Sequence, residues 1–298
     1  MGLRVLVGGW ICYNRTILMY FLEKLCRFKQ IPEFLIDLNL KTDISWVRRL
    51  TDSNPDSTRE LVDQLSVENQ LPYSKMQLRD KFHMPQFFDK SFCPISFFYL
   101  GMLTRRDDFF MCLPNLNMKT IFSDYFNEIH KVNTGTLYAE MMSSFAQKPD
   151  LPKLFANNWS IYISQLPEAV FLSVNENFYR TTFYSLLHQF LSHLYVWRME
   201  SSHASGRSDL EMEGKFHTPF AGLRFLMEFK YISNAKLQNR KSEIDTFQPP
   251  ELDWAQLEGY ARDQSRQYPE QQIRSYLIYC FGNKGFRVFP LEQRERSS

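Results

Sequence analysis

The sequence predicts an α+β protein, in which a helical, winged-helix-like N-terminal part is followed by an α/β domain. Two patterns carry this prediction. The first half of the chain contains amphipathic helical stretches and then a hairpin pattern. The second half contains a long helical stretch, three strand-like stretches, a further helix and two final strands. Hydrophobic residues make up 44% of the 298-residue chain, which is enough apolar surface for one or two buried cores.

The first half begins with an apolar segment and an amphipathic helix. In residues 16–28 (TILMYFLEKLCRF), one stripe is apolar and consists of Leu18, Phe21, Leu22, Leu25 and Phe28. Further helices are expected over residues 43–50 and 57–65. Asp43 and Ser57 are suited to begin these helices, because their side-chain oxygens can accept backbone N–H groups of the first turn.

A hairpin pattern follows these helices. Residues 96–115 predict the end of a helix and then two short strands, with a polar tip at residues 105–108. Another helix is expected over residues 117–132. Helices followed by a hairpin indicate a winged-helix-like layout, although other small α+β units share the pattern.

The next stretch has the composition of a domain boundary. It contains Pro149 and Pro152 among polar residues, which places the boundary between residues 148 and 172. We therefore expect one domain over residues 1–150 and a second over residues 170–298.

The second half has a clear order of elements. A helix over residues 175–195 has an apolar stripe that includes Phe183 and Leu187. The other expected elements are strands over 195–200, 206–212 and 223–232, a helix over 253–268, and a terminal hairpin of strands 275–281 and 286–291.

Two of the expected strands carry charged residues in an apolar setting. Side chains alternate between the faces of a strand, so Glu228 and Lys230 share one face of residues 223–232. If the strand over 206–212 is a neighbour, Asp209 can meet them at one end of the sheet. Such a cluster suits Mg²⁺, which favours one or two carboxylates, with water and phosphate oxygens completing the site. The alternative is a cross-strand ion pair on a half-exposed sheet.

Several motifs together resemble a known family, the PD-(D/E)xK nuclease superfamily domain that follows an AAA-ATPase-like region in bacterial proteins. The segments ENFYRTTFYSLLHQFL, GRSDLEM, LMEFKY and AQLEGYA are similar to its conserved segments, in the same order. The first half is similar to the stretch between ATPase and nuclease, through CYNRTILMYFLE, FFYLGMLT and LPNLNMKTIF. The resemblance implies an α/β nuclease-like domain with a mixed central sheet.

The resemblance also implies roles for individual residues. Asp209, Glu228 and Lys230 are the expected catalytic residues. Asp209 and Glu228, with Glu176, are the expected ligands of Mg²⁺ or Mn²⁺. The supporting residues are Glu176, Tyr179, Arg207 and Gln256. For Arg207, contact with phosphate, pairing with Glu176 and a plain surface role all stay open. Glu211, on the same strand face as Asp209, is either a supplementary acid or an ordinary solvated residue, and we favour the solvated residue.

The chain departs from the family pattern in three respects. Asn14-Arg15 stands where the family usually has Asn-Pro. Ser208 stands where the superfamily name has proline. More important, the sequence contains no GxxxxGK[ST] phosphate-binding loop, so ATP hydrolysis is not carried over to this protein.

Composition limits the remaining possibilities. The formal net charge is only +2, so a nucleic-acid surface would have to be a local patch. The five cysteines are scattered and never in CxxC spacing, which argues against a zinc site or a disulfide framework. No apolar run is long enough to span a bilayer, so we expect a cytoplasmic protein with no membrane association.

The predicted function is metal-dependent hydrolysis of phosphodiester bonds in nucleic acid, with DNA favoured over RNA by analogy. One alternative is a catalytically inactive nuclease fold that serves as a binding module. Another is a regulatory or interaction subunit, either with a protein partner that supplies the missing ATPase or as a homo-oligomer.

Overall fold

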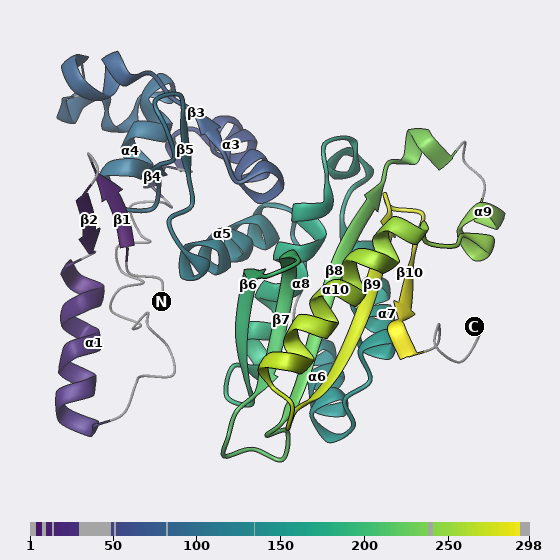
Figure 1. Cartoon of the computed structure of the whole chain (residues 1–298). Coiled ribbons are helices and arrows are strands. Elements are labelled where there is room, and N and C mark those ends of the chain that lie inside the picture. The colour runs from purple at the N-terminus through teal and green to yellow at the C-terminus, as the bar shows by residue number, and fades with distance from the viewer. Residues whose placement is uncertain are drawn as a thin grey trace. The chain divides into compact units, whose positions relative to one another are not determined.

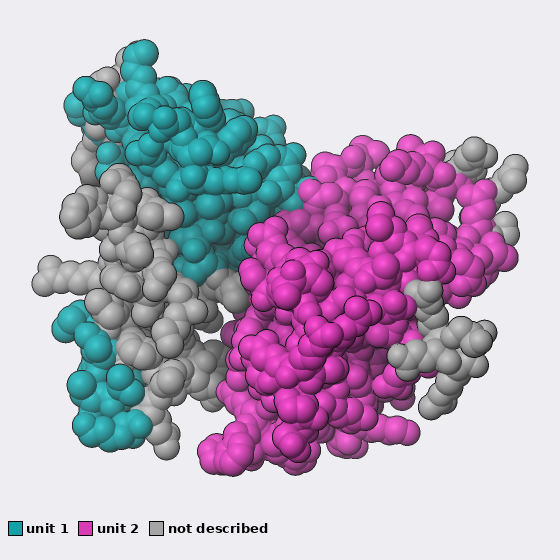
Figure 2. Space-filling view, viewed as in Figure 1, with its two compact units in different colours: residues 1–131 teal, residues 132–298 magenta. Residues whose placement is uncertain are grey.

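The computed structural model describes residues 4–7, 10–13, 15–29, 49–50, 52–81, 83–133, 135–237 and 241–292. The chain folds into two compact units, residues 1–131 and 132–298, which Figure 2 shows in teal and magenta. Each unit contains its own buried apolar residues. Among the described helices, none combines the length and the apolar character needed to cross a membrane.

The first unit is mainly helical and carries two small antiparallel sheets. Its principal elements are β1 (Arg4–Val7), β2 (Trp10–Tyr13), α1 (Arg15–Phe28), α3 (Pro55–Glu68), β3 (Leu71–Pro72), α4 (Cys93–Tyr99), β4 (Thr104–Arg105), β5 (Phe110–Cys112) and α5 (Leu116–Ile129). Short helical turns lie between β3 and α4, namely η2 (Gln77–Lys81), η3 (Met84–Phe88) and η4 (Lys90–Phe92).

These elements confirm the predicted helices over 16–28, 57–65 and 117–132 and the predicted hairpin. The helix expected over residues 43–50 falls mostly outside the described residues. The three-stranded sheet has the order β3-β5-β4, with β3 between α3 and α4 and the β4–β5 hairpin after α4. The winged-helix-like layout stays a prediction. The hairpin tip is closed by Asp107, whose carboxylate accepts the backbone N–H groups of Phe109 and Phe110.

The second unit is built around a five-stranded sheet of order β10-β9-β8-β7-β6. Its elements are α6 (Thr136–Gln147), α7 (Leu151–Ile161), η5 (Ile163–Gln165), η6 (Glu168–Leu172), α8 (Glu176–Leu191), β6 (Tyr195–His203), β7 (Gly206–Gly214), β8 (Leu223–Ile232), η7 (Asn234–Leu237), α9 (Lys241–Thr246), α10 (Glu251–Gln267), β9 (Gln272–Phe281) and β10 (Gly285–Pro290). Neighbouring strands are antiparallel except β8 and β9, which are parallel. The mixed central sheet is therefore confirmed.

Helices cover both faces of this sheet (Figure 1). On one face, Leu257 and Tyr260 of α10 pack with Leu226 of β8 and Leu277 of β9. On the other face, Phe183 of α8 packs on aromatic rings of α7 and β8, with ring centroids 5.0 Å from Phe155 and 6.1 Å from Phe229. The crossover helix α10 connects two parallel strands, as such strands require.

The helices α6 and α7 belong to the second unit, although α6 lies within the predicted first domain and α7 begins just after its expected end at residue 150. They supply aromatic packing beneath the sheet, for example from Phe145 to Phe225, with ring centroids 5.9 Å apart. The domain limits of 1–150 and 170–298 stay a prediction, because compact units are not the same as evolutionary domains.

A buried polar network ties α10 to the sheet. Glu211 and Arg224 are both almost completely buried, and Arg224 Nη1 lies 3.3 Å from Glu211 Oε2. Glu211 Oε1 accepts hydrogen bonds from Ser208 (2.8 Å) and from Gln264 of α10 (3.2 Å), and lies 2.8 Å from His203 Nε2. The expectation that Glu211 is solvated is wrong, because α10 covers the face of β7 on which Glu211 lies.

Candidate active site

The site begins where two central strands separate. β7 and β8 pair from Glu213 with Arg224 to Leu210 with Met227. Beyond this point, β7 continues with β6 alone, while β8 continues with β9 alone. Asp209 and Glu228 are the next residues on the two strands, so their carboxylates lie at the opening of a fork.

Asp209 is held in this fork by hydrogen bonds to both of its oxygens. Its Oδ2 accepts the backbone N–H of Phe229 on β8 at 2.8 Å, a donor that is free because the β7–β8 ladder has ended. Its Oδ1 accepts from Arg180 Nη1 on α8 at 2.6 Å. The side chain is therefore fixed by one strand and one helix that are distant in sequence.

Glu228 and Lys230 lie on the same face of β8, as strand alternation predicts. Lys230 Nζ donates to Glu228 Oε1 at 3.1 Å and to Gln256 Oε1 at 3.2 Å. Gln256, on α10, also donates to Glu228 Oε1 at 2.9 Å and to the hydroxyl of Tyr260 at 2.7 Å. Three of the predicted residues, Glu228, Lys230 and Gln256, therefore form one hydrogen-bonded group.

The site carries more negative charge than its own cations neutralise. Burial, and then the charge of Asp209, raise the pKa of Glu228 to about 7, against the opposing effect of Lys230. Burial and the charge of Asp209 likewise raise the pKa of Glu176, in the first turn of α8, to about 7. Burial lowers the pKa of Lys230, but the carboxylates of Glu228, Glu176 and Asp253 together outweigh it, so the net shift of the pKa is upward. Asp209 raises the pKa of both Glu176 and Glu228 because these three carboxylates lie close together.

Two of the predicted supporting residues, Tyr179 and Arg207, make their contacts outside the group of Glu228, Lys230 and Gln256. Tyr179 is almost fully buried, and its hydroxyl donates to the backbone oxygen of Gly282 at 2.7 Å, which ties α8 to the β9–β10 turn. Arg207 is largely exposed, and its Nη1 lies 3.8 Å from Glu200.

Sequence reasoning missed two charged residues of this site, Arg180 and Asp253. The charge of Asp253 contributes to the raised pKa values of both Glu176 and Lys230. Helical spacing could have found both residues. Arg180 lies four residues after Glu176, and Asp253 three residues before Gln256, so each shares a helix face with a residue that was singled out.

The donor set fits a divalent cation, although the carboxylates do not form a complete cage. In the parts of the chain that the structure describes, no three His, Cys, Asp or Glu side chains are arranged to hold a metal ion by themselves. Mg²⁺ does not need such a set, because one or two carboxylates with water and phosphate oxygens are its usual ligands. Glu228 Oε2 is buried and accepts no hydrogen bond from any described residue, which is costly for a carboxylate oxygen unless a cation approaches it.

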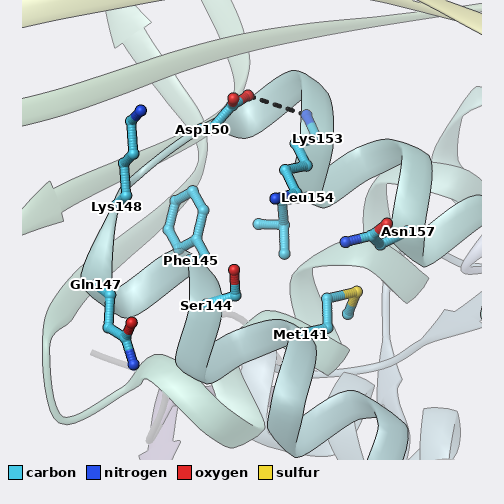
Figure 3. Close-up of a pocket in the computed structure, with 9 residues that line it drawn as sticks. All are labelled: Met141, Ser144, Phe145, Gln147, Lys148, Asp150, Lys153, Leu154 and Asn157. Atoms are coloured by element: carbon cyan, nitrogen blue, oxygen red, sulfur yellow. Dashed lines mark hydrogen bonds between the residues drawn. The ribbon is translucent and has the colours of Figure 1, made fainter.

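The cavity shown in Figure 3 is separate from this acidic cluster. It has a volume of about 190 Å³ and lies between α6 and α7, with Met141 and Leu154 among its lining residues. None of the predicted site residues lines it, so we attach no function to it.

The geometry places clustered carboxylates and a lysine at the fork of two strands, in a mixed sheet that helices cover on both faces (Figure 1). Residues 174–289 match the family model of the PD-(D/E)XK nuclease superfamily. This segment, from just before α8 to β10, is therefore a domain of that superfamily, whose members generally depend on divalent metals. The resemblance to the superfamily is confirmed, whereas the AAA-ATPase-like context stays a prediction. Searches of curated proteins and of solved structures found no match to the chain.

The raised pKa values predict a pH dependence of stability. The ordinary value for both Glu176 and Glu228 is 4.5, and the folded value is about 7. Between these values the folded state binds more protons than the unfolded state, so the free energy of unfolding falls as pH rises. The stabilising contribution is complete below the unfolded pKa and is lost as pH rises through the folded pKa.

Urea unfolding of the metal-free protein between about pH 5 and pH 8 measures this effect. In Glu228→Gln, which cannot ionise, part of the decline is expected to disappear. A decline of equal size in wild type and Glu228→Gln would contradict the assignment of the raised pKa to Glu228.

Proposed function

We propose that the second unit is a metal-dependent nuclease that hydrolyses phosphodiester bonds in nucleic acid. The observation that carries this proposal is the meeting of Asp209, Glu228 and Lys230 at the β7–β8 fork, within a segment that matches a nuclease superfamily. DNA is the proposed substrate by analogy with the superfamily. A bacterial setting belongs to the same proposal, since it rests on the resemblance.

Asp209 and Glu228, with Glu176, are the residues that would hold Mg²⁺ or Mn²⁺. When bound, a divalent cation would neutralise charge on the scissile phosphate and lower the pKa of a bound water. Asp209 has its carboxylate oriented by the Phe229 N–H group. Glu228 offers Oε2, because its Oε1 is already engaged by Lys230 and Gln256.

Lys230 is the proposed catalytic cation. Its ammonium group is held by Glu228 and Gln256, and its side chain remains 22% exposed, so it can reach a phosphate or a water at the mouth of the fork. It stays protonated at neutral pH, because the surrounding carboxylates raise its pKa. A fixed ammonium group stabilises negative charge that develops on the phosphate oxygens in the transition state.

Gln256 and Tyr260 support this arrangement from α10. Gln256 contacts both Glu228 and Lys230 and is itself held by the Tyr260 hydroxyl. Because Tyr260 is buried in the core beneath α10, the amide of Gln256 is fixed relative to β8. Gln256 thereby bridges the carboxylate and the ammonium group.

The metal requirement is the direct test of the proposal. The purified full chain is expected to nick plasmid DNA or cleave single-stranded DNA with Mg²⁺ or Mn²⁺. Cleavage is expected to stop with excess EDTA and to return when excess Mg²⁺ is added back, because Asp209 and Glu228 require a cation to act on phosphate.

Two results would change the conclusion. Cleavage that continues in EDTA would remove the metal from the mechanism. A protein that binds DNA or RNA but cleaves no form of either, with both metals, would favour the inactive binding module.

A further inference from the structure

Arg180 is a buried cation shared by two carboxylates. Only 8% of its surface is exposed. Its Nη1 donates to Asp209 Oδ1 at 2.6 Å, and its Nη2 donates to Glu200 Oε1 at 3.1 Å and to Asn177 Oδ1 at 2.9 Å. The guanidinium group therefore bridges a carboxylate inside the fork and another outside it.

Arg180 occupies the oxygen of Asp209 that the backbone leaves available. Oδ2 already accepts the Phe229 N–H group, and Oδ1 accepts the guanidinium. A divalent cation at Asp209 has to share this carboxylate with a positive charge in direct contact with it. Like charges repel more strongly in a partly buried site than in water, because the effective dielectric constant is lower.

Glu200 lies where its carboxylate can hold part of the Arg180 guanidinium charge and so reduce the charge that acts on Asp209. The register of β6 and β7 sets Met199 beside Leu210 and Ser201 beside Ser208, so Glu200 lies opposite Asp209. Its backbone has φ of 55°, in the left-handed region that non-glycine residues rarely adopt. The Glu200 side chain is 41% exposed, so it can accept the guanidinium without being buried itself.

We propose that Arg180 is an internal counter-cation that competes with the divalent ion for Asp209, and that Glu200 moderates the competition by holding part of the guanidinium charge. This inference rests on the proposed metal-dependent function and concerns the regulation of the same site. Loss of the Arg180 charge therefore tightens metal binding, and loss of the Glu200 charge weakens it.

The test measures binding of Mn²⁺ alone to the purified full chain, without nucleic acid, by isothermal titration and by electron paramagnetic resonance of free Mn²⁺. A buffer of about pH 8 keeps Glu176 and Glu228 ionised, since their pKa values are about 7. Arg180→Met is expected to bind Mn²⁺ about tenfold more tightly than wild type, and Glu200→Gln about threefold more weakly.

Arg198→Met is the matched control. Arg198 lies on the same strand as Glu200 and pairs with a carboxylate, at 2.6 Å from Glu213, but its ion pair does not involve Asp209. Its Mn²⁺ affinity is expected to stay within about twofold of wild type. If Mn²⁺ binds as much more tightly to Arg198→Met as to Arg180→Met, the effect comes from the loss of any positive charge, and the proposal is overturned.

The remaining outcomes also decide the matter. If Arg180→Met binds Mn²⁺ about 10–100-fold more weakly, Arg180 orients Asp209 for the metal rather than competing with it, and the proposal fails. If Arg180→Met does not fold, the Mn²⁺ affinity of Glu200→Gln alone tests the proposal. An affinity equal to or higher than that of wild type would overturn it. Wild-type protein that binds no Mn²⁺ would overturn the proposed function itself, and the inference with it.

Discussion

Lys230→Ala is expected to lower the rate of metal-dependent cleavage by about 10²–10³-fold, the usual cost of removing one preorganised electrostatic group. The fold should persist, because the Lys230 side chain lies at the mouth of the fork and is not part of a hydrophobic core. Asp209→Asn is expected to reduce cleavage to a similar extent, because the substitution removes one of the two central carboxylates.

The assay is nicking of plasmid and single-stranded DNA with Mg²⁺ or Mn²⁺ and an EDTA control. Lys148→Ala is the matched control, since Lys148 is an exposed lysine of the same unit that lies at the cavity between α6 and α7 (Figure 3). Cleavage that survives in both Lys230→Ala and Asp209→Asn would mean that other residues, or a contaminating enzyme, carry the activity.

Arg224→Met is expected to destabilise the second unit by about 3–5 kcal/mol, although Arg224 lies away from the fork. The Arg224 guanidinium is completely buried, lies 2.9 Å from Glu213 and 3.3 Å from Glu211, and stacks 4.0 Å from the ring centre of Tyr268. Methionine keeps most of the volume but leaves the buried Glu211 carboxylate without its cation. The cost is therefore that of an uncompensated buried charge.

Hydrogen exchange of β7 and β8 is the suitable measurement, because it reports on the second unit alone. Arg198→Met provides the comparison: Arg198 pairs with the same Glu213, but its side chain is 43% exposed, so its loss is expected to cost about 0–1 kcal/mol. Equal protection of β7 and β8 in the two variants would show that the buried network contributes little to stability.

The sequence by itself determined the order of the elements and the residues that share a strand face. The helices over 57–65 and 117–132 and the terminal hairpin follow from periods of 3.6 and 2, which local backbone geometry imposes. The same rule placed Glu228 and Lys230 together. The matching of Asp209 to them came from the resemblance, because nothing in one strand specifies its neighbour.

Only the tertiary structure decided which groups neutralise which charges. Glu211 reads as a solvated residue in its own strand, yet α10, more than 40 residues later in the chain, covers it and makes it part of a buried network. Asp209 receives its cation from Arg180, which is 29 residues earlier in the chain. The physical reason is that the electrostatic environment of a side chain depends on segments brought together by folding, whereas periodicity reports only on neighbours within a few residues.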